Sequence, residues 1–473
     1  MKRSLHIALA AAGLAVVLTA CNPFLTGEGL SNDPNNPTTA TRQALFMGVQ
    51  ATTFGQQESS VALTVCMWMQ QCTGNGGRFV EQFGKYVIDE GSFSFDFNSV
   101  YTGGGLTDIR KIEASAAAAP DSIFLGVAQI YEALIIGTAA DVWGDIPYTQ
   151  ALTTSQPALD NQFAVYDSVQ ALLSRAIVNL AGAGAGPGDR DLVFGGDPAK
   201  WSAVAHTMKA RFFLHTVEGA GAGLLGARTA AQVYADAIAQ ATLGISDPSG
   251  AGDFAAFHGQ ATSERNVWFQ FSQTTFGIDL VAGKFMVDLM NTRSDPRLPQ
   301  YFGQDAVGGY GGDDVNIGPL NSDSVSAVDG SRNSPQFRQP FVTYAENELI
   351  LAEANNQTGN DAVALTHLNA ERAAAGLGAT AGAGAALFDS IMTEKYVAMF
   401  QNIEVWNDYR RTCLPALTPY LIANGASPVF NDKIPGRFYY GSNERNTNSN
   451  IPAPSAQLAA NGFRNRNDPN ACP

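Results

Sequence analysis

Aromatic and amide side chains gather at three places along the chain, and these residue types suit the binding of a neutral ligand. The three groups are Trp68 with Gln70 and Gln71; Phe93, Phe95, Phe97 and Tyr101; and Trp268 with Phe269, Gln270 and Phe271. A sugar ring presents apolar C–H faces and a hydroxyl edge, so an aromatic platform beside amides suits a glycan. For any single aromatic residue, the competing interpretation is a place in the hydrophobic core. The candidate ligand-binding residues are Trp68, Gln70, Gln71, Tyr101, Trp268, Gln270 and Phe271.

Catalytic signatures are absent from the sequence. It contains no Gly-x-Ser-x-Gly elbow, no P-loop, no His-Glu-x-x-His and no Cys-x-x-Cys motif. His206 and His215 are nine residues apart, so on one helix they would project about 180° from each other and could not share a metal ion. His258 and His367 are isolated. The sequence therefore predicts no catalytic residue, no metal ligand and no cofactor.

Neighbouring acidic residues leave one enzymatic alternative open. Asp313 with Asp314, and Glu346 with Glu348, have the residue type that glycoside hydrolases use in pairs, and only the separation of the carboxylates in space decides such a role. Three further aspartates lack the spacing of an EF-hand calcium loop and are better explained as turn and capping residues: Asp189, Asp191 and Asp197.

The composition is that of a globular protein with an acidic surface. The chain has 473 residues, of which 45% are apolar and 15% charged, and its formal net charge is −15. That length suffices for a large core or for two domains. The negative charge makes nucleic acid and anionic lipid surfaces poor partners.

The N-terminus has the pattern of a bacterial lipoprotein signal peptide. Lys2 and Arg3 precede an apolar run, and Leu18-Thr19-Ala20 places small residues directly before Cys21. We expect residues 1–20 to be removed and Cys21 to be lipidated; an ordinary signal peptide with an incidental cysteine is the alternative. The next residues, 21–40, are rich in Asn, Pro, Thr and Gly and predict an extended tether.

Export places the other four cysteines in an oxidising compartment. Four cysteines allow three connectivities, and free buried thiols are a further alternative. We favour the pairing of neighbours in sequence, Cys66 with Cys72 and Cys413 with Cys472.

A long apolar run predicts the central helix of the fold. Residues 122–140 carry apolar side chains around most of a helical circumference, and the run then breaks into Asp141-Val-Trp-Gly-Asp-Ile-Pro-Tyr148. Gly144 permits a turn and Pro147 prevents the helix from continuing. A membrane span is the rival interpretation, but Gln129 and Glu132 interrupt the run. The pattern favours a buried helix with an aromatic stop.

Helical spacing recurs in pairs along the rest of the chain, and strands are expected to be few. Residues 244–340 lack helical spacing, except for one helix predicted over 279–290. From Ile403 onward the sequence predicts a loop-like chain. The remaining predicted helices cover 39–54, 61–71, 106–119, 163–183, 198–217, 231–243, 341–355, 361–375 and 387–402.

Five segments, in order, resemble the SusD/RagB-like family of outer-membrane nutrient-binding lipoproteins. They follow the signal peptide and together span nearly the whole mature chain. They are Asp33-Pro-Asn-Asn-Pro-Thr38, Asp141-Val-Trp-Gly-Asp-Ile-Pro-Tyr148, the Gly-Asp…Trp…Lys-x-Arg segment of 191–211, Tyr344-Ala-Glu-Asn-Glu-Leu-Ile-Leu-Ala-Glu-Ala354 and the Pro-x-Arg…Glu…Asn segment of 434–448.

The resemblance implies a mainly α fold, a TPR-like superhelix of helical pairs with a large irregular insertion. It divides the chain into a single domain over 41–473, with a scaffold over 41–243 and 341–411, an insertion over 244–340 that binds the ligand, and a loop-rich closing segment over 412–473. It also implies a lipid-anchored protein on the cell surface, in the outer membrane, that caps a TonB-dependent, SusC-like transporter. No ligand residue follows from these motifs.

The leading hypothesis is therefore a non-catalytic surface lipoprotein that captures an oligosaccharide and passes it to its transporter. The alternatives are a peptide-binding member of the same family, a surface glycoside hydrolase, and an assembly scaffold without a small ligand.

Overall fold

The computed structural model describes residues 40–74, 76, 79–318 and 322–472. The expected signal peptide, Cys21 and nearly all of the expected tether lie outside the described residues. Helices dominate the described part of the chain, which agrees with the prediction of a mainly α fold.

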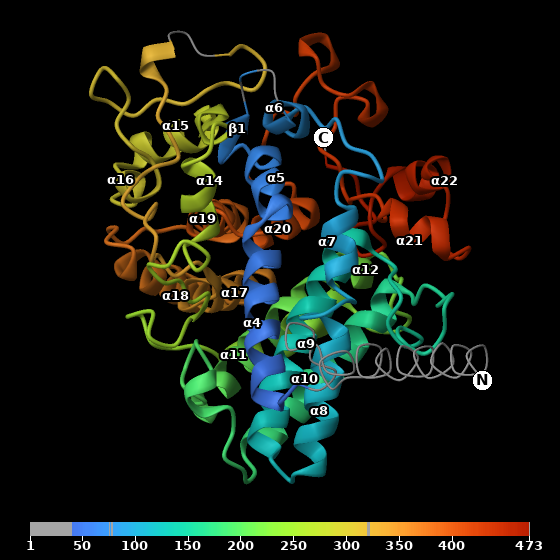
Figure 1. Ribbon diagram of the computed structural model, residues 1–473. Coiled ribbons are helices and arrows are strands. Elements are labelled where there is room, and N and C mark those ends of the chain that lie inside the picture. Colours follow the sequence, from blue (N-terminus) through green and yellow to red (C-terminus); the bar gives the residue numbers. More distant parts are fainter. Residues whose placement is uncertain (1–39, 75, 77–78, 319–321, 473) are drawn as a thin grey trace, which may run out of the picture.

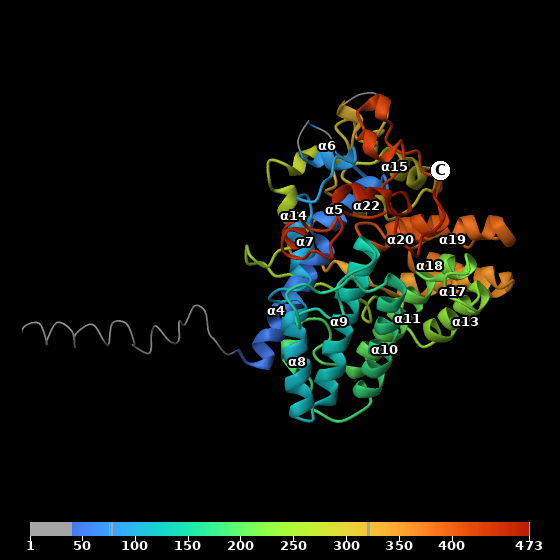
Figure 2. The same ribbon diagram turned by 90° about the vertical axis from the view of Figure 1, so that its right-hand side faces the viewer.

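Long helices stack side by side to form the scaffold. Each packs against a neighbour in a continuous series that can be followed across Figures 1 and 2. The series consists of α4 (Arg42–Glu58), α8 (Leu106–Ala118), α9 (Ser122–Trp143), α10 (Gln162–Leu180), α11 (Pro198–Leu214), α13 (Ala230–Ala241), α17 (Tyr344–Gln357), α18 (Asp361–Ala374) and α19 (Gly384–Ala398).

The central helix is α9, as its apolar run predicts. Asp121 caps it by accepting a hydrogen bond from the amide of Phe124 at 3.2 Å, and Gly144 ends it with φ +81°. Among the described residues it is the one helix long and apolar enough to cross a membrane, but 83% of its apolar window is buried inside the protein. The aromatic stop also holds the C-terminal segment, because the indole N–H of Trp143 donates to the carbonyl of Tyr439 at 3.0 Å.

Two short antiparallel sheets join the irregular region to the scaffold. Strand β1 (Cys72–Gly74) pairs with β3 (Leu280–Ala282), with Cys72 opposite Ala282. Strand β2 (Phe254–Ala255) pairs with β4 (Pro340–Val342). The helix predicted over 279–290 is displaced: α15 covers Lys284–Arg293, because Leu280–Ala282 is already committed to the sheet.

Shorter helices and turns complete the molecule, and most of the shorter helices lie in the upper half of Figure 1. They are α5 (Ser60–Trp68), α6 (Phe79–Gly84), α7 (Ser94–Ser99), α12 (Val217–Gly221), α14 (Val267–Ser272), α16 (Leu298–Tyr301), α20 (Glu404–Thr412), α21 (Ser442–Thr447) and α22 (Pro454–Ala459), with 3₁₀ turns at Gly188–Arg190, Gly277–Asp279, Ser322–Ser324, Ile422–Asn424, Pro428–Phe430 and Ala460–Gly462.

Helix α20 corrects the expectation that the chain is loop-like from Ile403 onward. Its composition is polar, yet Glu404, Asp408, Arg410 and Arg411 are all buried. Each belongs to an ion pair inside the protein; the guanidinium of Arg411, for example, lies 2.9 Å from Glu353 of α17. Helix α20 is therefore an interior helix whose charges are paired, which apolar periodicity does not detect.

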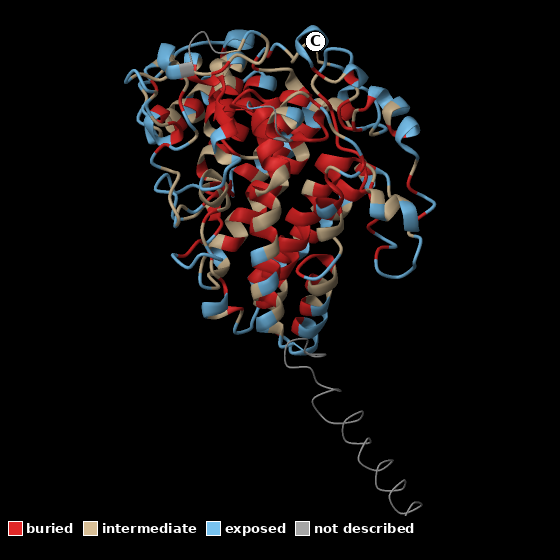
Figure 3. Cartoon of the chain, turned by 45° about the horizontal axis from the view of Figure 1, so that its top comes forward, coloured by how far each residue is buried: buried red, intermediate tan, exposed pale blue. Residues whose placement is uncertain are grey.

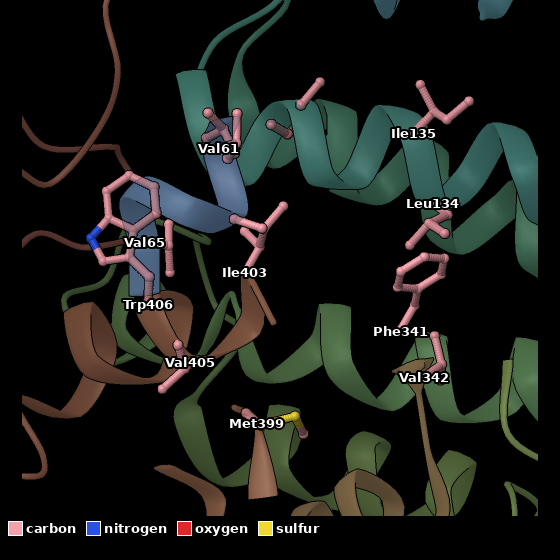
Figure 4. Close-up of a cluster of buried hydrophobic side chains, with 14 of the residues drawn as sticks. Val61, Val65, Leu134, Ile135, Phe341, Val342, Met399, Ile403, Val405 and Trp406 are labelled. Atoms are coloured by element: carbon pink, nitrogen blue, oxygen red, sulfur yellow. The ribbon is translucent and has the colours of Figure 1, made fainter. Parts of the chain in front are cut away.

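The core runs through the middle of the molecule, where buried residues concentrate (Figure 3). Figure 4 shows how segments far apart in sequence meet there. Leu134 of α9 lies beside Phe341 of β4, and Val61 and Val65 of α5 lie on the same side of the view as Trp406 of α20. The two disulfides are Cys66–Cys72 and Cys413–Cys472, with Cα atoms 5.3 and 5.2 Å apart, which is the pairing that the sequence favoured.

Buried charges connect two of the five segments that resemble the SusD/RagB-like family. Arg211, late in α11, lies 2.6 Å from a carboxylate oxygen of Glu346 in the Tyr-Ala-Glu segment at the start of α17, and it also donates to the carbonyl of Phe341. Arg211 and Glu346 are 5% and 1% exposed, so this ion pair is part of the interior. Arg211 therefore links α11 to α17 through this ion pair.

Candidate functional site

Two pockets of more than 200 Å³ in the described part of the chain contain side chains that the sequence nominated. We call the first the aromatic pocket, a space of about 270 Å³, and the second the acidic pocket, of about 420 Å³. Residues of α5, α6 and α14 line the aromatic pocket, and residues of α15 line the acidic pocket. These four helices lie in the upper half of Figure 1. Their volumes are near those of pockets that hold small organic ligands.

The aromatic pocket lies where the junction of α4 and α5 faces α6 and α14. Its walls are mostly apolar, and three of its side chains are aromatic. The lining residues are Glu58, Ser59, Ser60, Leu63, Phe83, Val267, Trp268 and Phe271.

Helix α14 presents the aromatic residues of this pocket. Asn266 caps α14 by accepting from the amide of Phe269 at 2.9 Å, and its own N–H donates to the carbonyl of Pro335 at 2.8 Å. These bonds fix the short helix, so that Trp268 and Phe271, three residues apart, both reach the pocket. Trp268 is 6% exposed, and its indole N–H has no hydrogen-bond partner in the described structure.

The polar wall of the aromatic pocket is held by buried acids. Glu58 accepts from the amide of Val267 at 3.3 Å and lies 2.9 Å from the Nε2 atom of His258. Burial raises the pKa of Glu58, while His258 works in the opposite direction. Ser60 donates to Asp96 at 2.9 Å, which places its hydroxyl at the pocket wall. The pocket thus offers ring faces with a few fixed polar groups, an arrangement that suits the apolar face of a sugar.

The acidic pocket lies between α15, the loop that follows Asp313 and the segment before Leu421. An aromatic ring, Phe285, stands beside amide and carboxylate side chains there. The lining residues are Gln70, Lys284, Phe285, Asp288, Asp313, Asp314, Val315, Asn316, Ile317, Thr418 and Leu421.

Asp313 is held firmly at this pocket. Its amide donates to the carbonyl of Ala282 at 2.8 Å, and its carbonyl accepts from the amide of Lys284 at 3.0 Å and from the hydroxyl of Thr73 at 3.1 Å. Burial, together with the carboxylate of Asp314, raises the pKa of Asp313 to about 6. One carboxylate oxygen of Asp313, Oδ1, has no hydrogen-bond partner in the described structure.

The candidate ligand residues do not form one site. Trp268 and Phe271 line the aromatic pocket, and Gln70 lines the acidic pocket. Gln270 lines neither pocket; its amide donates to the carbonyl of Arg265 at 2.6 Å and braces α14. Tyr101 lies beside Phe97, with ring centroids 5.5 Å apart, and is also outside both pockets.

The nomination of Trp68 and Gln71 requires correction. Trp68 has 0% exposure, its indole N–H donates to the carbonyl of Phe83 at 2.9 Å, and its ring lies 5.4 Å from that of Trp406. Gln71 is equally buried and donates to the carbonyl of Tyr396 at 2.8 Å. Both side chains hold the core together and have no surface to offer a ligand.

The sequence missed Phe83 and Phe285 as pocket residues. Phe83 lies between Phe79 and Tyr86, and Phe285 is a single aromatic residue, so no local pattern distinguishes either from a core residue. The pairing of β1 with β3 brings Phe285 near Gln70. Asp313 and Asp314 were noticed as an acidic pair, and the structure places both at the acidic pocket.

His215 forms a buried ionic cluster with Asp141 and Glu404. Its Nδ1 lies 2.8 Å from an oxygen of Asp141 and its Nε2 lies 2.6 Å from an oxygen of Glu404. The three residues have the spacing to hold a metal ion. Both ring nitrogens already face a carboxylate, and Arg211 lies 3.7 Å from Glu404, so the cluster is explained as an ion network between α9, α11 and α20.

A third pocket, of about 300 Å³, lies within the C-terminal segment between Tyr409, Phe430 and Phe463. Arg410 at its wall is paired with Asp468 at 3.4 Å, and Cys472 at its rim belongs to a disulfide. None of the candidate ligand-binding residues lines this pocket.

The fold and pockets together define a class: a TPR-like helical scaffold with pockets where its helices meet the irregular segments. A family model described as "Starch-binding associating with outer membrane" matches residues 34–441. The chain therefore belongs to this SusD-like family.

Solved structures support the same fold. A chitin-binding SusD homologue from Flavobacterium johnsoniae is 18% identical, with a TM-score of 0.71 over 90% of this chain and 98% of that one. A SusD homologue from Bacteroides fragilis is 17% identical, with a TM-score of 0.72 over 91% and 99% of the two chains. No curated protein matches the chain.

Proposed function

We propose that this protein is a non-catalytic lipoprotein of the outer-membrane surface that captures an oligosaccharide and delivers it to a TonB-dependent, SusC-like transporter. Membership of a family described as starch-binding and associated with the outer membrane supports the carbohydrate and the location. Cys21, the proposed lipidation site, supports the anchor.

The observation that carries the glycan assignment is the aromatic pocket. Trp268, Phe271 and Phe83 line it beside the hydroxyls of Ser59 and Ser60. Stacking of a sugar ring on an aromatic face, combined with hydrogen bonds to its edge, is the usual way in which proteins hold neutral glycans.

The test is isothermal titration calorimetry of the protein without its first 21 residues against a broad panel of soluble polysaccharides. Trp268→Ala is expected to weaken binding of the best ligand about tenfold or more, because an aromatic pair is worth about 1 kcal/mol beyond the area it buries. Val178→Ala is the control, since Val178 is 72% exposed on α10, outside both pockets. Absence of binding to every polysaccharide would refute the glycan assignment, and binding of peptides from a protein digest instead would favour the peptide alternative.

The paired carboxylates of the acidic pocket favour one second candidate, a surface glycoside hydrolase. Asp313, with its raised pKa, has the property of a general acid and stands next to Asp314. That candidate predicts release of the chromophore from a chromogenic glycoside, abolished by Asp313→Asn. Our proposal predicts that neither the unmodified protein nor Asp313→Asn releases the chromophore.

A further inference from the structure

The acidic pocket carries more negative charge than the protein itself balances. Three carboxylates line it, those of Asp288, Asp313 and Asp314, against a single ammonium, that of Lys284. Lys284 is one turn before Asp288 on α15 and forms an ion pair with it. Asp313 and Asp314 are therefore left without a cationic partner within the pocket.

Hydrogen bonds hold both acids at the pocket. The backbone of Asp313 is fixed by its bonds to β1, β3 and α15, and the Asp314 carboxylate accepts from the amides of Asn316 at 2.9 Å and Ile317 at 3.1 Å. Asp313 is 5% exposed, and its Oδ1 lacks a partner. A buried carboxylate oxygen without a partner is costly, and a cationic ligand close to Asp313 would offset that cost.

The geometry favours an organic cation over a bound metal ion. A metal site needs several ligand atoms close together. Among the described residues, one group of three has its ligand atoms within 4.8 Å of one another, and it is Asp141, His215 and Glu404, outside the acidic pocket. The pocket of about 420 Å³ is also far larger than an ion needs. Phe285 lines the same space, and its ring suits the apolar face of a sugar.

We propose that the acidic pocket binds a sugar unit with a free, protonated amine, such as a glucosamine residue of an oligosaccharide. The ammonium lies against Asp313 and Asp314, and the ring lies against Phe285. This proposal rests on the proposed function, since it names the class of glycan that the protein captures.

The test compares three ligands of equal length by calorimetry: oligomers of glucosamine, of N-acetylglucosamine and of glucose. The glucosamine oligomer is expected to bind about tenfold more tightly than either neutral oligomer, because hydrogen bonds between charged partners are stronger than those between neutral groups. That preference is expected to shrink as salt concentration rises.

Three variants test whether the carboxylates of the acidic pocket cause the preference for the glucosamine oligomer. Asp313→Asn and Asp314→Asn should each remove most of the preference for the glucosamine oligomer. Ile317→Lys brings a competing ammonium to the rim and should have the same effect; Ile317 is 78% exposed, so folding is not affected. Asp167→Asn, on the exposed surface of α10, is the matched control and should retain the preference.

The outcomes separate this proposal from the proposed function. If the glucose or N-acetylglucosamine oligomer binds as tightly as the glucosamine oligomer, the amine assignment is overturned while glycan capture stands. If no glycan binds, both fail. Binding of CaCl₂ that depends on Asp313 and blocks glucosamine, or equal binding of a lysine-rich peptide, would likewise overturn the assignment.

Discussion

His215 carries a charge in the interior of the scaffold. Burial alone would lower the pKa of this imidazole, but the carboxylates of Asp141 and Glu404 raise it to about 10. The folded pKa is thus above the ordinary value near 6.5. Protonated His215 therefore stabilises the fold fully below about pH 6.5, and this contribution disappears as the pH rises through about 10.

The free energy of unfolding is expected to fall between pH 7 and pH 10, as measured by urea denaturation with tryptophan fluorescence. His215→Asn should remove most of this decline and lower stability at pH 7 by about 3–5 kcal/mol, because it leaves two buried carboxylates with one cation fewer. His206→Asn is the control on the same helix, since His206 is only partly buried and bonds to Gln240. An unchanged pH dependence in His215→Asn would contradict this account.

At the scale of elements, the contact between α9 and α11 depends on a glycine. A Cβ atom on Gly137 would lie 2.1 Å from the ring of Phe212, which is 1% exposed and cannot move aside. On the exposed side of α4, a Cβ atom on Gly48 would meet nothing within 4 Å. The same substitution should therefore have opposite effects at the two positions.

Gly137→Ala is expected to destabilise the protein by about 1–3 kcal/mol through overpacking. Gly48→Ala should instead stabilise it by about 0.5–1 kcal/mol, because alanine loses less backbone entropy in a helix. Thermal unfolding monitored by circular dichroism measures both changes. Equal shifts of Tm in the two variants would show that the close approach at Phe212 is not the cause.

Periodicity predicted the scaffold elements well and failed where polar residues are buried. Residues 122–140 predict α9 because most of their side chains are apolar. Helix α20 was missed because the partners of its charges, such as Glu353, are distant in sequence. For the same reason Trp68 was assigned to a binding surface: its neighbours Trp406 and Phe438 become visible only after folding. The pockets depend on such long-range contacts, so sequence could nominate Trp268 and Gln70 but not place them.

At the scale of the whole molecule, the C-terminal segment closes the fold onto α9 and α11. The side-chain amide of Asn465 donates to the carbonyl of Asp141 at 2.6 Å, and that of Asn467 donates to the carbonyl of His215 at 3.1 Å. The Cys413–Cys472 disulfide ties the end of this segment to the end of α20. The C-terminal segment therefore stabilises the region of the buried ionic cluster of Asp141, His215 and Glu404.

Loss of this disulfide is the test of that role. Cys413 and Cys472 are 59 residues apart, and closing a loop of that length stabilises a protein by about 4 kcal/mol through the entropy of the unfolded chain. The double variant Cys413→Ala/Cys472→Ala should lose about this much in urea denaturation. The Cys66–Cys72 pair, six residues apart, closes a loop worth only about 2 kcal/mol. Limited proteolysis should then cut after Thr412 faster in the first double variant than in Cys66→Ala/Cys72→Ala, and equal rates would mean that hydrogen bonds alone hold the closing segment.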